Sequence, residues 1–81
     1  MQKNWYVYLL KCLDGSYYTG ITNDLDKRMN AHKTGKGSKY VRAKGFDKMI
    51  SSREYPNKSL ALKTEYKIKK LSKAEKLEFF K

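Results

Sequence analysis

Two side chains that could act on a phosphate group, Arg28 and His32, lie four residues apart in this 81-residue sequence. On a helix, that spacing places them one turn apart on the same face. A guanidinium can stabilise negative charge on a phosphate, and an imidazole can carry a proton near neutral pH. The ordinary alternative is an ion pair between Arg28 and Asp24, with His32 simply packed, and spacing alone favours this alternative.

Glu65 is the third candidate, as the ligand of one divalent cation. Mg²⁺ often binds through only one or two carboxylates, because water and substrate phosphate complete its octahedron. The alternative for Glu65 is an ion pair with Lys69, four residues later. The sequence has a single histidine, far from the single cysteine, Cys12, so a histidine-based zinc site is excluded. No close carboxylate pair suits a two-metal site, so any metal-assisted reaction uses one ion.

Tyrosines are concentrated near the start of the chain, where four of the seven lie between residues 6 and 18. Tyr8 and Tyr18 could activate a water molecule or position a phosphate through their phenol groups. Composition alone favours the alternative, in which they are packing aromatics with hydroxyls at the rim of a sheet.

The composition of residues 34–45 predicts a basic loop interrupted by glycine. Tyr40 lies in this loop between the basic residues Lys36, Lys39, Arg42 and Lys44. The glycine and lysine spacing is wrong for a phosphate-binding P-loop. Across the chain, 19 Lys and Arg residues against 8 acidic ones give a formal charge of +11, which favours a polyanionic partner, nucleic acid first and an anionic membrane surface second. Cations suit phosphates and aromatic rings suit bases, so we expect this loop to bind nucleic acid.

Two strands, over residues 5–12 and 17–22, are predicted to carry the tyrosines, because β-branched and aromatic residues are dense there. Asp14-Gly15 between them is typical of a tight turn, since glycine accepts a positive φ. A two-residue loop would place Tyr8 and Tyr18 on opposite faces of the sheet. A three-residue loop, residues 13–15, would pair Tyr8 with Gly20 and bring both tyrosines to one face. Propensity does not choose between these registers.

A helix is predicted to follow the hairpin, from an N-cap at Asn23 to about Lys33, because Asp26 lies three residues after that cap. Leu25, Met29 and His32 would share one side of this helix. A weakly patterned third strand is predicted over residues 47–55.

Two further helices are expected at the end of the chain. Asn57 or Ser59 would cap the first, which runs to about Leu71 with an apolar stripe made by Leu60, Ala61, Ile68 and Leu71. Residues 72–75 form a capping box that begins a last helix through Phe79 or Phe80. The whole pattern predicts one α+β domain over residues 1–81, with a small three-stranded, mainly antiparallel sheet flanked by helices.

No apolar run approaches the length of a membrane span, and the N-terminus lacks the apolar region of a secretion signal. We therefore expect a cytoplasmic protein that does not bind a membrane. A single cysteine in a reducing compartment predicts that Cys12 is a small buried apolar residue and not a nucleophile.

Taken in order, these residues resemble the GIY-YIG nuclease domain. Residues 6–8 (Tyr-Val-Tyr) resemble its first signature, residues 18–20 (Tyr-Thr-Gly) resemble its second, and Arg28, His32 and Glu65 follow in the family's order. The segments DGSYYTGIT, GKGSKY and IKKLSKAEK are typical of a small standalone bacterial group. That group is related to the nuclease half of the bacterial excinuclease and to certain structure-specific nucleases.

The resemblance implies a metal-dependent DNA endonuclease, structure-specific and acting in DNA repair or recombination. Tyr18 would activate or orient the attacking water and Tyr8 would help to position it. Arg28 would stabilise charge on the phosphate, His32 would assist proton transfer, and Glu65 would hold one Mg²⁺ or Mn²⁺ ion. Both tyrosines must then lie on one face, so the resemblance predicts the three-residue loop.

The chain departs from the family pattern at three positions. Tyr6 stands where the first signature has glycine, Thr19 replaces the signature isoleucine, and Ile21 stands where several relatives place a lysine. Relatives also usually add a second domain for DNA targeting, so the resemblance leaves targeting to a partner protein. The alternative function is a non-catalytic nucleic-acid-binding module with the same fold, which would use the basic loop.

Overall fold

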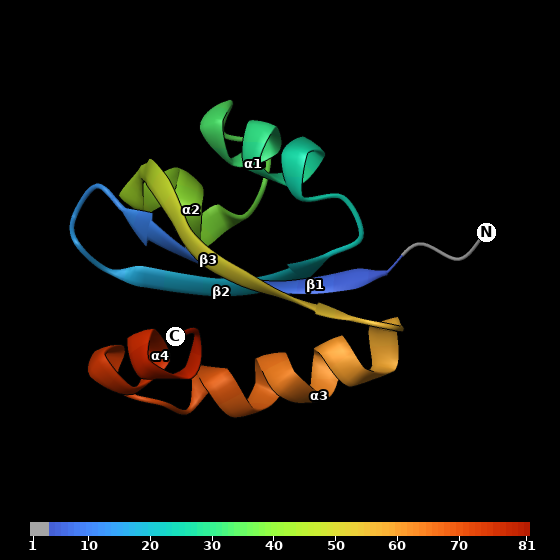
Figure 1. The fold of residues 1–81 in the computed structure, drawn as a ribbon. Helices are drawn as coiled ribbons and strands as arrows, with labels where there is room; N and C mark the ends of the chain where they lie inside the picture. Colours follow the sequence, from blue (N-terminus) through green and yellow to red (C-terminus); the bar gives the residue numbers. More distant parts are fainter. Residues whose placement is uncertain (1–3) are drawn as a thin grey trace.

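The computed structural model describes residues 4–81, in which a three-stranded antiparallel sheet is covered by helices on both faces (Figure 1). The elements are, in chain order, β1 (Trp5–Cys12), β2 (Tyr17–Thr22), α1 (Leu25–Lys33), α2 (Lys39–Lys44), β3 (Phe46–Tyr55), α3 (Lys58–Lys69) and α4 (Lys73–Phe79). The strand order is β2-β1-β3, so β1 is central and both neighbours are edge strands. The predicted α+β architecture is confirmed.

The alternation of side chains along β1 divides the core into two layers. Tyr8, Leu10 and Cys12 pack with Val41 on the face that α1 and α2 cover. Val7 packs with Ala61 and Ile68 on the face that α3 and α4 cover. Successive strand residues point to opposite faces, so the central strand supplies both layers. The buried Cys12 agrees with its predicted apolar role.

The hairpin between β1 and β2 has the three-residue loop. Leu10 pairs with Tyr18 and Tyr8 pairs with Gly20, so both tyrosines point to the same face. Gly15 has a φ of +87°, in the left-handed region that favours glycine. The backbone N–H of Cys12 donates to the carbonyl of Ser16 at 2.8 Å and closes the loop.

The N-cap of α1 is Asp24, one residue after the predicted Asn23. The Asp24 carboxylate accepts a hydrogen bond from the backbone N–H of Lys27 at 3.1 Å. The N–H of Asp24 itself donates to the hydroxyl of Thr22 at 3.1 Å, which holds the turn between β2 and the helix. Asn and Asp have similar capping propensity, so the geometry of this turn decides between them.

Residues 39–44 form the short helix α2, where the sequence predicted only a loop. Ser38 caps the helix, because its hydroxyl accepts from the backbone N–H of Val41 at 3.1 Å. Gly45, with a φ of +83°, ends it. Val41, in the middle of α2, is buried against the sheet, and this contact outweighs the loop tendency of the preceding glycines. The following strand begins at Phe46, one residue earlier than predicted.

The two C-terminal helices follow the prediction, with two corrections. Asn57 caps α3 and Ser72 forms the predicted capping box of α4. However, α3 ends at Lys69 and not at Leu71. Leu60, predicted in the apolar stripe, is 41% exposed, so the buried side of α3 rests on Ala61 and Ile68.

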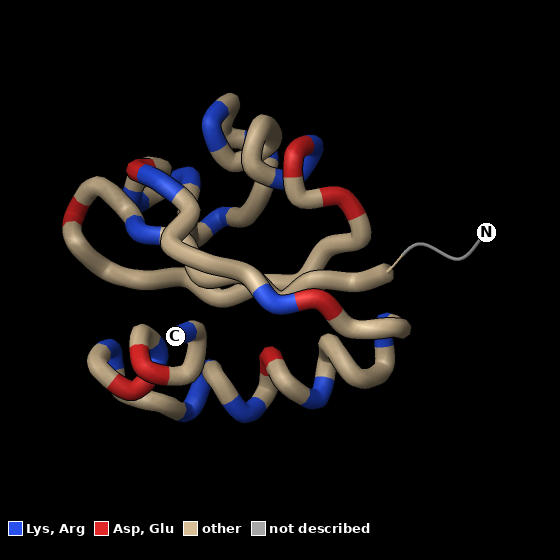
Figure 2. The backbone as a smooth tube through the Cα atoms, in the orientation of Figure 1, with Lys and Arg blue, Asp and Glu red and all other residues tan. Residues whose placement is uncertain are grey.

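Basic residues outnumber acidic ones, and blue segments run along α3 with a single red one among them (Figure 2). None of the helices within residues 4–81 has the length and apolar character needed to cross a lipid bilayer.

We predict that Asp24→Ala lowers the free energy of unfolding by about 1 kcal/mol, because it leaves a helix N–H group without its acceptor. Urea unfolding followed by circular dichroism measures the change. Asn23→Ala is the matched control and should change stability by less than half as much. A larger loss for Asn23→Ala would contradict the assigned cap.

Candidate active site

The centre of the candidate site is a buried hydrogen bond between Tyr8 on β1 and His32 on α1. The Tyr8 hydroxyl lies 2.9 Å from Nε2 of His32. Tyr8 is 2% exposed and His32 is 3% exposed. Leu25 and Met29 pack against the same core layer, as their predicted shared face with His32 requires. The last turn of α1 is thereby fixed against the central strand.

Aromatic rings extend from this bond towards the surface. The ring of Tyr18 lies 5.8 Å from that of His32 and 6.3 Å from that of Tyr8, between centroids. Tyr40 on α2 stacks on Tyr18 at 5.7 Å. On another side, Phe46 lies parallel to His32 at 6.4 Å. Tyr8, Tyr18 and His32, predicted from distant parts of the sequence, therefore lie together.

Burial keeps both members of the central pair uncharged at neutral pH. It raises the pKa of the Tyr8 phenol far above its ordinary value, and the neighbouring Tyr18 raises it further. Burial also lowers the pKa of His32, and the charge of Arg28 lowers it further. The site thus contains a protonated phenol bonded to a neutral imidazole. Nδ1 of that imidazole is buried, with no hydrogen-bond partner among residues 4–81.

Arg28 and Glu65 both act electrostatically on Tyr8. The positive charge of Arg28 lowers the pKa of the phenol and the negative charge of Glu65 raises it, although burial outweighs both. Arg28 comes from α1, above the sheet, and Glu65 from α3, below it (Figure 1). Charges on helices from both sides of the sheet therefore influence the Tyr8 hydroxyl.

Gly20 on the edge strand β2 explains how the hydroxyl of Tyr8, on the central strand β1, lies over β2. A Cβ atom at Gly20 would overlap the Tyr8 hydroxyl and would lie 2.6 Å from Cζ of Tyr8. The ring of Tyr8 therefore leans across β2 towards the edge of the sheet. Any side chain at position 20 would push the phenol away.

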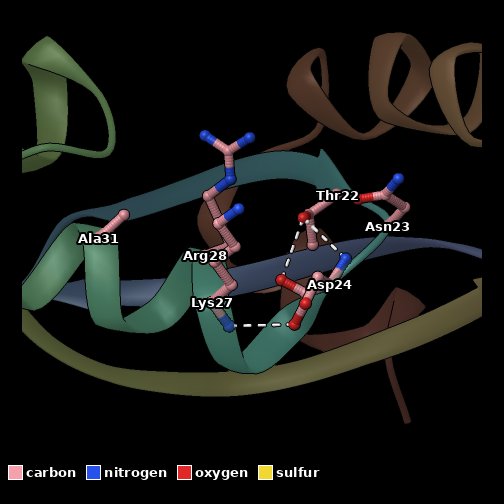
Figure 3. Close-up of a pocket in the computed structure, with 6 residues that line it drawn as sticks. All are labelled: Thr22, Asn23, Asp24, Lys27, Arg28 and Ala31. Carbon is pink, nitrogen blue, oxygen red and sulfur yellow. Dashed lines mark hydrogen bonds between the residues drawn. The ribbon is translucent and has the colours of Figure 1, made fainter.

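Arg28 is available to a ligand. It lines a pocket of about 190 Å³ at the junction of β2 and α1, together with Thr22, Asn23, Asp24, Lys27 and Ala31 (Figure 3). Within residues 4–81 its side chain forms no ion pair. The alternative pair with Asp24 is absent because that carboxylate caps α1. A phosphate in this pocket would meet an uncompensated guanidinium.

Glu65 forms the alternative ion pair that its spacing predicted. Its carboxylate lies 3.6 Å from Nζ of Lys69, with the two side chains 17% and 52% exposed. A long pair with an exposed lysine contributes little stability and can open. No group of three His, Cys, Asp or Glu residues that could hold a metal ion is found within residues 4–81. One carboxylate fits only a hard cation that keeps most of its water, such as Mg²⁺ or Mn²⁺.

The predicted nucleic-acid-binding residues separate into three environments. Lys36, Lys39 and Arg42 line one hollow of about 150 Å³ beside Ser38. Tyr40 packs on Tyr18 and so belongs to the aromatic cluster.

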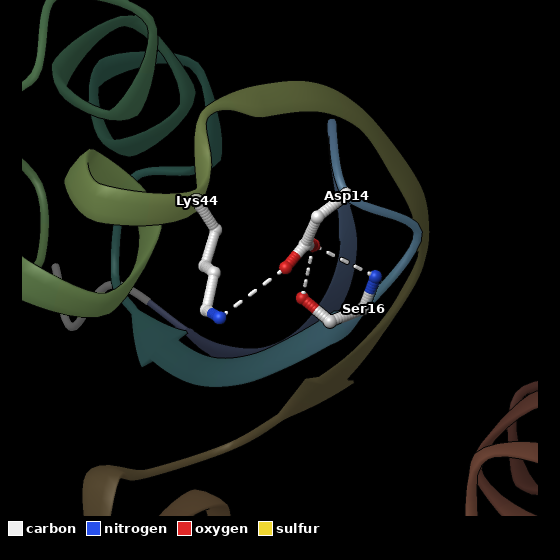
Figure 4. A network of polar contacts seen from close by, with 3 residues as sticks. All are labelled: Asp14, Ser16 and Lys44. Carbon is white, nitrogen blue, oxygen red and sulfur yellow. Dashed lines mark hydrogen bonds and ion pairs between the residues drawn. The ribbon is translucent and has the colours of Figure 1, made fainter.

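Lys44 is partly engaged with the hairpin loop. Its Nζ lies 3.4 Å from the carboxylate of Asp14, which also accepts from the N–H and hydroxyl of Ser16 (Figure 4). The pair ties the end of α2 to the β1–β2 turn. Lys44 is thus less free for phosphate than the three cations of the hollow.

Two residues of the site were not predicted from the sequence. Phe46 lies against the imidazole of His32. Gly37 approaches the same ring so closely that a Cβ there would overlap Nδ1 and would lie 2.7 Å from Cε1. The Ser38 cap signal could have revealed α2. With α2 ending at Gly45, the next strand then begins at Phe46. No local signal indicates the contact of Gly37.

The chain is similar to a protein-family model and to several known proteins. The model described as the GIY-YIG catalytic domain matches residues 4–78. A UPF0213 protein of Oceanobacillus iheyensis is 46% identical over 78 residues, which cover 96% of this chain and 91% of the relative. A UPF0213 protein of Halalkalibacterium halodurans is 45% identical over 73 residues, which cover 90% and 78%.

Two solved structures share the fold. The solution NMR structure of a protein from E. faecalis has a TM-score of 0.65 and 34% identity, over 96% of this chain and 83% of the other. The solution NMR structure of a UPF0213 protein from Bacillus halodurans has a TM-score of 0.58 and 43% identity, over 94% and 81%.

We predict that the free energy of unfolding falls as the pH is lowered from 7.5 to 5.5. The pKa of His32 is lowered on folding from its ordinary value of 6.5, so the unfolded chain binds more protons in this window. The stabilisation that comes from the neutral, buried His32 is complete above the pKa of the unfolded chain and is lost as the pH falls below that pKa. The lowered carboxyl pKa values of Asp14, Glu54 and Glu75 act only below about pH 4.5.

Urea unfolding at several pH values measures this dependence, and NMR follows the single histidine directly. His32→Gln should flatten the profile between pH 7.5 and 5.5. A wild-type profile that is already flat, or an imidazole that titrates at its ordinary pKa, would contradict the prediction.

Proposed function

Because the chain belongs to the GIY-YIG family of catalytic domains, we propose that it is a metal-dependent endonuclease that hydrolyses phosphodiester bonds in DNA. The observation that carries the proposal is the buried Tyr8–His32 hydrogen bond at a site where Arg28 and Glu65 also act. These are the groups that hydrolysis of a phosphodiester needs: a proton acceptor, a cation for the phosphate and a metal-binding carboxylate.

His32 and the two tyrosines handle the attacking water. The Tyr8 hydroxyl lies 2.9 Å from Nε2 of the neutral imidazole, so Tyr8 can take a proton from the attacking water while it passes its own proton to His32. Tyr18, half-buried beside both rings, orients the water. Because the pKa of Tyr8 is raised, a free phenolate is disfavoured, so the two proton transfers occur together and leave the phenol neutral and His32 protonated.

Arg28 and Glu65 handle the phosphate. The Arg28 side chain lines a pocket and has no ion-pair partner within residues 4–81, so it can stabilise the charge that develops on the phosphate oxygens. Glu65 would hold one Mg²⁺ or Mn²⁺ ion after releasing Lys69. When bound, such an ion supplies Lewis acidity for the phosphate and the leaving oxygen.

Lys36, Lys39 and Arg42 bind the DNA backbone in this proposal. Their shared hollow is lined in part by α2, whose Tyr40 stacks on Tyr18, so phosphate contacts there would bring DNA beside the site. The resemblance to the nuclease half of the bacterial excinuclease supports branched or damaged DNA as substrate, in repair or recombination, with a partner protein for targeting.

A non-catalytic DNA-binding module is the second candidate function. The observation that favours it is the Glu65–Lys69 ion pair, which occupies the only carboxylate assigned to the metal. Both functions use the same cations, so salt-dependent binding does not separate them. Metal-dependent cleavage does.

We predict that the protein nicks supercoiled plasmid DNA with Mg²⁺ or Mn²⁺ and that Glu65→Gln lowers the rate more than about 100-fold. The substitution removes the metal-binding charge and keeps the shape of the side chain. Glu78→Gln, which makes the same change on exposed α4, is the matched control and should cleave at the wild-type rate. Binding without cleavage by all three proteins would favour the module.

We predict that Arg28→Ala lowers the cleavage rate by about 10²–10³ while DNA affinity changes less than threefold. A preorganised cation at the reacting phosphate acts mainly in the transition state, whereas affinity is shared among 19 basic residues. Single-turnover cleavage and fluorescence anisotropy measure the two effects. Lys48→Ala on β3 is the control, because it removes the same charge outside the pocket that Arg28 lines. Equal losses of affinity and rate in Arg28→Ala would make Arg28 a docking residue.

A further inference from the structure

Two lysines at the junction between α3 and α4 lie over the rings of two tyrosines, one from α3 and one from β2. Nζ of Lys70 lies 4.2 Å from the ring centroid of Tyr66, and Nζ of Lys73 lies 4.9 Å from that of Tyr17. Tyr66 belongs to α3, Tyr17 begins β2, and the two lysines flank the turn between the helices. We call these four residues the α3–α4 surface.

Positive charge predominates in the segment that forms α3 and the turn to α4. The segment 56–73 has one acidic residue, Glu65, and six lysines, Lys58, Lys63, Lys67, Lys69, Lys70 and Lys73. The blue segments of Figure 2 follow α3 along its length. None of the six is needed to balance a neighbouring carboxylate except Lys69, which pairs with Glu65. A surface of this kind attracts a polyanion.

Tyr66 is the most exposed aromatic residue among those the structure describes, with 66% of its surface accessible. Nζ of Lys70 lies over one face of the Tyr66 ring, and Tyr66 as a whole stays largely exposed. Leu62, one turn earlier on α3, is 44% exposed. An exposed ring beside a cation can stack on a base while the cation meets the adjacent phosphate.

The α3–α4 surface lies near the candidate site but across the sheet from α2. The helix α3 packs on β1 and β2, and Tyr66 directly follows Glu65. Lys36, Lys39 and Arg42 are on the α1–α2 side, where Tyr40 already uses one ring face to stack on Tyr18. DNA that crosses the β2 edge can therefore contact cations on both sides of the sheet.

We propose that the α3–α4 surface binds an unpaired segment of the DNA substrate next to the cleaved phosphate. Stacking on Tyr66 requires a base that is not enclosed in a duplex, and Lys70 and Lys73 supply contacts to its phosphates. The inference rests on the proposed DNA substrate and adds its class: a junction between duplex and single strand.

The test measures DNA binding in EDTA, where the DNA stays intact. Fluorescence anisotropy compares a blunt duplex with the same duplex carrying a single-stranded extension. Tyr66→Ala should weaken binding of the extended DNA about tenfold and leave the blunt duplex within twofold. Tyr66→Phe, which keeps the ring, should bind like the wild type.

The lysines are tested through the salt dependence of binding. Lys70→Ala/Lys73→Ala should reduce the slope of log K against log salt by about 1.4 on the extended DNA, for two single-strand contacts. Lys48→Ala/Lys81→Ala, on and beside β3, removes the same charge and should leave the slope unchanged.

Failure of the inference and failure of the proposed function give different results. If the wild type binds both DNAs and Tyr66→Ala binds the extended DNA as tightly, the α3–α4 surface is not the site. Equal losses on blunt and extended DNA overturn the unpaired segment as its ligand. A wild type that binds neither DNA overturns both proposals.

Discussion

The hydrogen bond between Tyr8 and His32 is the constraint on which the rest of the candidate site depends. Both groups are buried, and a buried polar group without a partner costs about 1–3 kcal/mol. The bond can form only if β1 turns its even-numbered residues towards α1 and if the last turn of α1 faces the sheet. One contact thus couples the register of the hairpin to the orientation of the helix that carries Arg28.

Two glycines make that contact possible. Gly20 leaves room for the ring of Tyr8 to lean over the edge strand, and Gly37 leaves room for the ring of His32 beside the 34–38 turn. Neither has a positive φ, so their importance lies in space and not in backbone conformation. Gly37 also joins His32 to the hollow lined by Lys36 and Lys39, so one short segment holds the proposed proton acceptor and the proposed DNA contacts.

The sequence was most informative where the signal is local. Dense aromatic and β-branched residues place β1 and β2 correctly, and caps at Asn57 and Ser72 place α3 and α4. Local signals did not determine the hairpin register, because propensity allowed two loops. Only the resemblance required Tyr8 and Tyr18 on one face. The helix α2 was missed since its glycine-rich approach outweighed one serine cap, and burial of Val41 could not be seen in the sequence.

The site residues were found as a set because their order resembles a family, while their physical relation comes only from the fold. Tyr8 and the residues of α1 lie on one face of the sheet, and α3 with Glu65 lies on the other. Side chains from the two faces can reach the same substrate group only at an edge of the sheet. The edge strand β2, with Gly20 opposite Tyr8, provides that place. A site at the edge of a sheet is open to a long polymer on both sides. This openness is why a small basic domain, with cations on both faces, suits DNA better than a small enclosed substrate.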